Sequence, residues 1–203
     1  HQFLRSFPLL ISGICHCARP SIKSFSIIKN LKKHAFVQIE IFKDLKFPRS
    51  FSIFDYIKSR SDEFIGISDK IWEYAELSLN EYKSVACYLD FLKKEGFNVR
   101  EKAANVPTAF VATYGEGRPR IGILAEYDAL SSLSQKPGVA HKVPLVPGGH
   151  GHGCGHNLLG AGSLAAAVAV KKLIELGHLK GTVVFYGCPG EEGCAGKTFM
   201  ARD

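Results

Sequence analysis

Residues 148–157 read GGHGHGCGHN and place three histidines and one cysteine among five glycines. Thiolate sulfur and imidazole nitrogen are both ligands that zinc accepts in proteins. Glycine allows close approach and sharp turns, because its backbone adopts positive φ without a steric penalty. Cys154 and His156 are separated by a single glycine, so both can turn toward one metal ion. We therefore predict that these two residues are metal ligands.

A pair of adjacent carboxylates, Glu191 and Glu192, stands in a second glycine-rich stretch. One carboxylate of such a pair can bind a metal ion while its neighbour stays unbound and accepts a proton from water. Neighbouring carboxylates are common in solvated turns, so the pair alone indicates little. The ordered combination of CGH, a helix, a strand and then EE is much more specific.

Four further polar residues have more than one interpretation. Glu126 and Asp128 end a predicted strand, and Asp128 either orients a metal ligand or caps a turn. His150 and His152 are further ligands, donors to a substrate, or polar loop residues. The sequence leaves these alternatives open.

A phosphate-binding loop is an alternative for residues 190–198, which read GEEGCAGKT and end in GKT. That motif requires a glycine five positions before Gly196, where this chain has Glu191. Two carboxylates would also repel the phosphates that the loop must attract. We do not expect a nucleotide site there.

Periodic patterns predict the elements that position these residues. Apolar residues recur at helical spacing over residues 61–75, after Ser61 and Asp62 as possible caps, and again over residues 85–95. Residues 108–114 and 120–126 are β-rich and joined by GEGRP, which predicts a pair of neighbouring strands. A helix over 157–176 and a buried strand over 182–186 complete an α/β sandwich. Loops at the carboxyl ends of its strands would bring the polar residues together.

The excess of positive over negative charge lies in the N-terminal quarter of the chain. The net charge is +7, and residues 1–60 hold 11 lysines and arginines against 3 acidic residues. We expect residues 1–57 to be a leader or an extension outside the domain, as an organelle transit segment, a short secretory segment or translated non-domain sequence. Residues 58–203 are expected to form the domain. Nucleic-acid binding is not expected, because residues 1–60 lack aromatic platforms and a recognition motif.

We expect no membrane partner and a cytoplasmic location. The longest apolar run, residues 158–170, is interrupted by glycines and a serine and is shorter than the roughly 18 residues of a membrane span. The six cysteines show no regular disulfide pattern, which favours a reducing compartment. We interpret Cys87, Cys188 and Cys194 as packing residues.

Several motifs resemble the co-catalytic metallopeptidase superfamily of aminoacylases and carboxypeptidases. They are GHGCGHNLLG, AVKKLIELG, GTVVFYGCPGEEG and GKTFM, and they are most similar to the amidohydrolase branch typified by the p-aminobenzoyl-glutamate hydrolase B subunit. The stretches KIWEYAE, YLDFLKKEGF, PTAFVATYG and ILAEYDALSSLSQ extend the resemblance over about residues 58–203. The resemblance implies a three-layer α/β/α catalytic domain, of which this chain holds the N-terminal part.

The resemblance also implies two divalent ions, zinc or manganese, and a water that attacks an amide carbonyl. By position, Cys154, His156 and Glu192 resemble metal ligands and Glu191 resembles the general acid/base. Other branches carry His-x-Asp where this chain has Glu126-Tyr127-Asp128, which fits a branch in which the cysteine supplies the missing ligand.

We therefore expect a metal-dependent amidohydrolase that acts on an aminoacyl-glutamate conjugate, an N-acyl amino acid or a dipeptide. A non-catalytic metal-binding or regulatory chain is the alternative. Family members carry further ligand histidines and a smaller dimerisation domain, which would lie beyond Asp203. The fragment alone is therefore expected to be inactive, and the full-length protein to be a homodimer or a hetero-oligomer.

Overall fold

The computed structural model describes residues 52–203, and residues 53–203 form one compact unit. The predictions for residues 1–51 lie outside the described range. The first described helix, α2 (Ile53–Ser59), begins five residues before the expected start of the domain at residue 58. The division of the chain into a leader and a domain stays a prediction.

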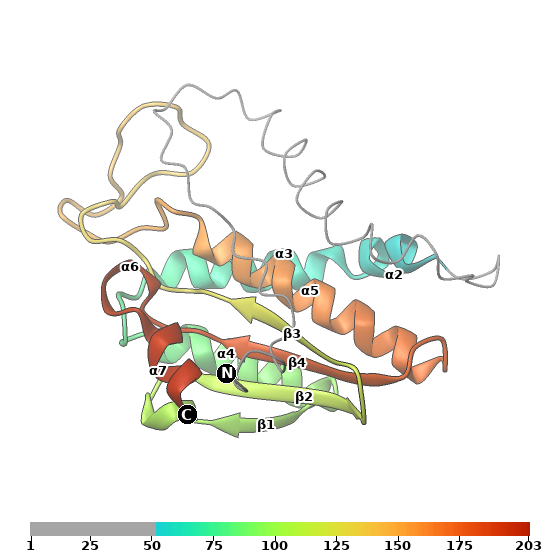
Figure 1. Ribbon diagram of the computed structural model, residues 1–203. Coiled ribbons are helices and arrows are strands. Elements are labelled where there is room, and N and C mark those ends of the chain that lie inside the picture. Colours follow the sequence, from blue (N-terminus) through green and yellow to red (C-terminus); the bar gives the residue numbers. More distant parts are fainter. Residues whose placement is uncertain (1–51) are drawn as a thin grey trace, which may run out of the picture. The chain divides into compact units, whose positions relative to one another are not determined.

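A mixed sheet of four strands forms the centre of the structure (Figure 1), in the order β1-β2-β4-β3. The strands are β1 (Asn98–Glu101), β2 (Phe110–Glu116), β3 (Arg120–Ala125) and β4 (Gly181–Gly187). β2 is antiparallel to both β1 and β4, whereas β3 runs parallel to β4. The carboxyl ends of β3 and β4 therefore meet at the same edge of the sheet.

The predicted pairing of the two strands around GEGRP is wrong, because β4 lies between β2 and β3. The three connecting residues 117–119 can span roughly 10 Å, which is about two strand spacings. They wrap around the start of β4, where Thr182 donates its backbone N–H to Pro119 O over 2.9 Å. β4 is apolar and buried along nearly its whole length, so the central position buries it most completely.

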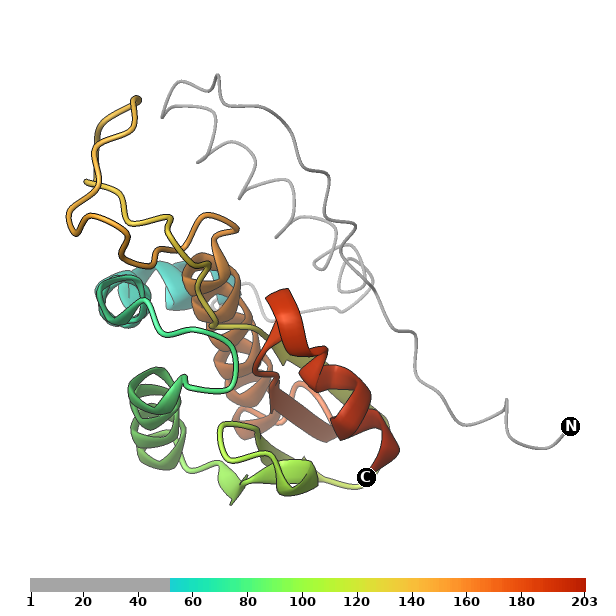
Figure 2. The same ribbon diagram turned by 90° about the vertical axis from the view of Figure 1, so that its left-hand side faces the viewer.

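Three helices gather on one face of the sheet (Figures 1 and 2), and their apolar stripes build the core against it. These helices are α3 (Ser61–Tyr74), α4 (Tyr82–Lys94) and α5 (His156–Glu175). Two short helices, α6 (Glu191–Cys194) and α7 (Gly196–Arg202), follow β4, and a 3-10 turn, η2 (Ala103–Asn105), follows β1. Figure 2 shows α7 on the side of the sheet opposite to α4. The predicted α/β fold is confirmed, and the extensive helical layer of the described residues covers one face.

The predicted helices agree closely with the structure, with two local differences. Phe64, Ile67 and Ile71 face the core as expected, but Trp72 is only half-buried. The helix that carries them is preceded by Arg60 and has no side-chain cap, so Ser61 is its first residue rather than a capping residue. Arg60 instead pairs with Glu95 over 2.6 Å, which joins the start of α3 to the end of α4.

The apolar character of α5 is explained by its central position. By length and composition α5 is apolar enough to cross a membrane, so the prediction that no segment reaches this length is wrong by that measure. However, 56% of its apolar stretch is buried inside the domain, as in the core helix of a folded protein.

Four aromatic rings lie under the carboxyl end of β3 and hold it in place. Tyr88 and Tyr127 have ring centroids 5.5 Å apart, and both pack against Phe110. The fourth ring, Phe185, packs against Tyr88 and Phe110. The Tyr127 hydroxyl donates a hydrogen bond of 2.6 Å to Thr108 O. Because Tyr127 lies between Glu126 and Asp128, this packing fixes the backbone that carries both carboxylates.

Candidate metal centre

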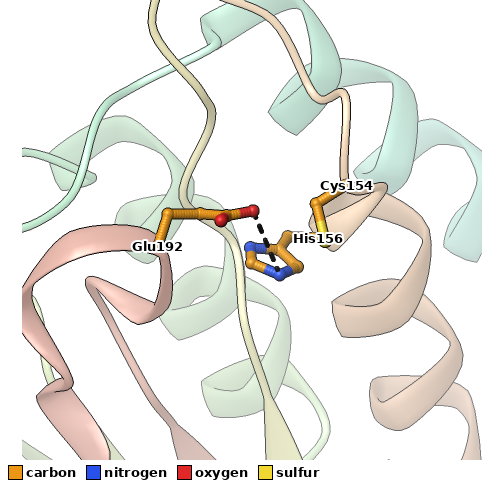
Figure 3. A group of neighbouring side chains, drawn as sticks. All are labelled: Cys154, His156 and Glu192. Carbon is orange, nitrogen blue, oxygen red and sulfur yellow. Dashed lines mark ion pairs between the residues drawn. The ribbon is translucent and has the colours of Figure 1, made fainter. Parts of the chain in front are cut away.

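Three segments converge at the carboxyl ends of β3 and β4. Figure 3 shows Cys154 and His156 at the start of α5 facing Glu192, which comes from the segment after β4. One ligand atom from each of these three residues lies within 4.8 Å of the others. Gly155, between the first two, has φ 88 and makes the turn that lets both point to one place. The structure thus brings together the three residues that the sequence proposed as ligands.

A second group shares the same imidazole. Ligand atoms of Glu126, His156 and Glu191 also lie within 4.8 Å of one another. His156 Nε2 is 3.1 Å from Glu126 Oε2 and 3.6 Å from Glu191 Oε2. The same nitrogen is 3.8 Å from Glu192 Oε1. One buried imidazole therefore faces three carboxylates from two different segments.

Asp128 fixes the orientation of His156. Asp128 Oδ1 lies 2.9 Å from His156 Nδ1, and its other oxygen accepts hydrogen bonds from the Ser78 hydroxyl and the Glu192 backbone N–H. Burial raises the pKa of Asp128, but these hydrogen bonds outweigh burial and lower it to about 2. An ionised carboxylate only accepts hydrogen bonds, so Nδ1 must carry the proton. The lone pair of His156 is then on Nε2, which points at the other carboxylates.

The negative charge around His156 makes its ring easier to protonate than an ordinary imidazole. Burial lowers its pKa, but the hydrogen bond to Asp128 and the charges of Glu126, Asp128 and Glu192 raise it above the usual value for histidine. A proton on Nε2 would satisfy the surrounding negative charge. A divalent cation satisfies the same charge, and histidine binds metal ions in its neutral form.

One observation indicates that the sulfur, nitrogen and oxygen atoms of this group would suit a divalent ion. Glu192 Oε1 is buried, and among the described residues it has no hydrogen-bond partner. A buried carboxylate oxygen that accepts no hydrogen bond is unfavourable unless a proton or cation meets it. Cys154, by contrast, is exposed, so its sulfur lies on the solvent side of the group. Sulfur, nitrogen and oxygen at this spacing suit zinc, while the carboxylates also suit manganese.

Glu191 differs from its neighbour in exposure. Its side chain is 39% exposed, against 21% for Glu192. Its backbone begins α6, a single helical turn in the second glycine-rich stretch. Glu191 can therefore reach a bound molecule and solvent, while Glu192 is held by its own backbone hydrogen bond to Asp128.

The structure separates His150 and His152 from both groups. His150 is exposed in the long segment before α5. His152 Nε2 lies 3.0 Å from Ile71 O, so the ring is directed toward the end of α3. Burial lowers the pKa of His152, which favours its neutral form. Of the interpretations left open for His152, a polar loop residue agrees best with this contact, which ties the loop to the end of α3.

Two residues of the site were missed in the sequence. Ser78, in the connection between α3 and α4, donates 2.8 Å to Asp128 Oδ2, and an isolated serine in an irregular segment gives no sequence signal. Lys197 forms an ion pair with Glu126 Oε1. The GKT motif contains this lysine, but a phosphate-binding loop would give it a different role. The lysine offsets part of the negative charge around His156.

The interpretation of three cysteines as packing residues agrees with their positions. Cys188 is 1% exposed, and burial raises the pKa of its thiol to about 12. Cys87 packs against the core cluster, and Cys194 is half-buried beside Gly190. None of these three is in the groups of possible metal ligands among the described residues.

The chain is similar to proteins of a known family. Residues 122–202 match the model of peptidase family M20/M25/M40. The chain is 48% identical over 149 residues to the p-aminobenzoyl-glutamate hydrolase B subunit of Escherichia coli, an alignment that covers 73% of this chain and 31% of that protein. The chain thus spans about a third of the length of the curated relatives it matches.

Two solved structures share the fold. A protein of methicillin-resistant Staphylococcus aureus assigned as an aminohydrolase superimposes with a TM-score of 0.62 at 24% identity, covering 74% of this chain and 38% of that chain. A Bacillus subtilis protein described as a dinuclear metal-binding peptidase of the M20 family has a TM-score of 0.54 at 26% identity, covering 66% and 37%.

Proposed function

Residues 122–202 belong to peptidase family M20/M25/M40, and on this premise we propose that the chain is part of a metal-dependent amidohydrolase. The observation that carries the proposal is the group formed by Cys154, His156 and Glu192, whose ligand atoms lie within 4.8 Å of one another. These residues come from two segments that are far apart in the sequence. A thiol, an imidazole and a carboxylate meeting in this way match the donors of a zinc or manganese site.

We propose that Cys154, His156 and Glu192 hold one divalent ion, and that Glu126, beside the same imidazole, lines the position of a second. The Bacillus subtilis relative is described as dinuclear, which supports a pair of ions. Bound divalent ions polarise an amide carbonyl and make water a stronger acid. Asp128 holds His156 with its proton on Nδ1, and so keeps Nε2 available as a ligand.

Glu191 is the proposed general acid/base. Its half-exposed carboxylate lies at the edge of the group, where it can accept a proton from water and pass it to the leaving amine. The ion pair between Lys197 and Glu126 reduces the negative charge that would otherwise repel an attacking oxygen. The hydrogen bond from the Glu192 N–H to Asp128 holds Glu192 in place as a ligand, while Glu191 stays free to transfer a proton.

The proposed substrate is an amide of an amino acid. The Escherichia coli relative is named for hydrolysis of p-aminobenzoyl-glutamate, which favours an aminoacyl-glutamate conjugate, with N-acyl amino acids and dipeptides as alternatives. A shallow pocket of about 340 Å³ lies beside Glu192 and is lined partly by Leu77, Ala129 and Leu130. This largely apolar surface suits an aryl or acyl group of such a substrate.

Assembly and location are also proposals. The relative is named as one subunit of a hydrolase, which supports a hetero-oligomer for the whole protein, with a homodimer as the alternative. Because this chain spans about a third of its relatives' length, we propose that turnover also requires residues outside it. A cytoplasmic location, which the cysteine pattern favours, stays a prediction.

Two measurements distinguish an enzyme from a non-catalytic metal-binding chain. In this chain, Co²⁺ should give the charge-transfer absorption of a thiolate ligand, and Cys154→Ser should abolish that absorption. Glu191→Gln should leave it intact. In a protein of the relatives' full length, Glu191→Gln should lower metal-dependent hydrolysis of p-aminobenzoyl-glutamate by at least about 100-fold. Hydrolysis that persists in this variant would show that the proposed base is wrong.

A further inference from the structure

Glu81 is a buried carboxyl group that the proposed chemistry does not use, although it contacts the segment that carries Glu191. The residue is 0% exposed and directly precedes α4. Its Oε1 accepts hydrogen bonds from Leu79 N over 2.9 Å and from Gly190 N over 2.8 Å. Gly190 immediately precedes Glu191, so this carboxyl links the α3–α4 connection to the segment after β4.

The segment from residue 190 to residue 192 is held at both ends. The Gly190 N–H is bound by Glu81, and the Glu192 N–H is bound by Asp128 Oδ2 over 3.0 Å. Glu191 lies between these two anchored amides. Gly190 has φ 63, and a Cβ there would lie 3.1 Å from Cys194 Cβ and from Leu79 Cδ2, so the backbone path is closely confined.

Packing alone does not explain a carboxyl group at this position. Oε2 of Glu81 and Oγ1 of Thr108 are both buried, and in the described part of the chain they have no hydrogen-bond partner apart from each other. Burying polar atoms with so few partners is unfavourable, and an apolar side chain of similar volume would avoid it. Burial raises the pKa of Glu81, but Oε1 can accept the two N–H donors in either protonation state.

We propose that Glu81 is a positioning residue, which fixes the carboxylates of Glu191 and Glu192 relative to His156 by holding the Gly190 N–H. This inference rests on the proposed function, because it assigns the residue an effect on the reacting groups. Asp128 orients the imidazole and one end of the segment, and Glu81 holds the other end. Neither residue needs to contact the substrate.

Two substitutions of Glu81 separate hydrogen bonding from packing. Glu81→Gln keeps an oxygen that can accept from Leu79 and Gly190, whereas Glu81→Met keeps a similar volume but removes the acceptor. Glu76→Met is the matched control. Its carboxylate accepts from the backbone N–H groups of Lys83 and Ser84, each over 2.9 Å, so it supports the start of α4 from the same connection.

The first readout is kcat and KM of the Zn²⁺-loaded protein of full length with p-aminobenzoyl-glutamate. We expect Glu81→Met to lower kcat about 10- to 100-fold with little change in KM, and Glu81→Gln and Glu76→Met to stay within about threefold of wild type. Equal losses for Glu81→Met and Glu76→Met would overturn the proposal, because a general loss of stability would then explain both. An unchanged kcat in Glu81→Met, or an equal loss in Glu81→Gln, would overturn it as well.

The second readout is the Co²⁺ affinity of this chain, followed by the thiolate absorption. We expect about a tenfold or greater loss for Glu81→Met but not for Glu81→Gln or Glu76→Met, because Glu192 is then displaced from the other ligands. If wild type shows no metal-dependent hydrolysis, the proposed function fails. The Co²⁺ comparison still decides whether Glu81 positions the ligands, and equal affinities of wild type and Glu81→Met would refute that role.

Discussion

Asp128→Asn is the perturbation that tests most directly how the site is organised. The carboxylate of Asp128 accepts from His156 Nδ1, the Ser78 hydroxyl and the Glu192 N–H, and it is 1% exposed. Asparagine has the same shape but only one acceptor oxygen. Its NH₂ group must therefore face at least one of these donors. If it faces His156, the ring relieves the conflict by moving its proton from Nδ1 to Nε2.

The expected loss of unfolding free energy in Asp128→Asn follows from the pKa of Asp128. A fall from the ordinary value of 3.8 to about 2 means that the surroundings favour the charged form by about 2.5 kcal/mol. We expect the metal-free chain to lose about 2 to 3 kcal/mol of unfolding free energy at pH 7 in Asp128→Asn. Metal affinity should fall about 10- to 100-fold, because a proton on Nε2 occupies the lone pair that a metal ion needs.

Urea unfolding of the metal-free chain with a chelator present measures the first quantity, and Co²⁺ titration measures the second. The pH dependence has a defined sign. The pKa of Asp128 is lower in the folded chain, so its stabilisation is present above the unfolded value of 3.8 and is lost as pH falls toward about 2. The difference between wild type and variant should therefore be full at pH 7 and shrink below about pH 4.

Asp69→Asn, which changes an exposed carboxylate on α3, is the matched control and should alter neither quantity appreciably. If Asp128→Asn unfolds at the same urea concentration as wild type at pH 7, the hydrogen bonds to Asp128 do not stabilise the fold as described. If it also binds Co²⁺ with unchanged affinity, the orientation of His156 does not depend on this carboxylate.

Two further predictions concern the packing of α5 near the site and the ion pairs of Glu95. Gly160→Ala should lower the free energy of unfolding by about 1 to 3 kcal/mol, because the new Cβ would overlap the Tyr88 hydroxyl. Gly162→Ala on the same helix is the control. Its Cβ would meet nothing within 4 Å, so it should raise the free energy of unfolding by about 0.5 to 1 kcal/mol. Equal melting temperatures for the two variants would contradict this packing. Glu95→Gln, which weakens the ion pairs of 2.6 Å with Arg60 and 3.1 Å with Lys171, should cost about 1 kcal/mol at pH 7. The pKa of Glu95 is lowered, so this cost should be full above the unfolded value of 4.5 and shrink as pH falls below it, and a cost that grew as pH fell would exclude an ionic origin.

Local chemistry in the sequence determined the ligand-bearing segments and the type of fold. Cys154 and His156 are two positions apart, and a glycine between them allows the turn that makes them neighbours. The helices could be predicted because their apolar faces recur with the helical period, and this period depends only on nearby residues. The order of a thiol, an imidazole and a glutamate pair was likewise sufficient to suggest a metal-dependent hydrolase.

Only the tertiary structure decided which distant groups complete the site. The sequence suggested that the strands around GEGRP pair with each other, whereas β4 lies between them and brings Glu191 and Glu192 beside His156. The contacts of Ser78 and Glu81 with this region join positions 50 and 109 residues apart. Such contacts depend on which elements pack together, and no local period or spacing encodes that choice, because it minimises the exposed apolar surface of the whole domain.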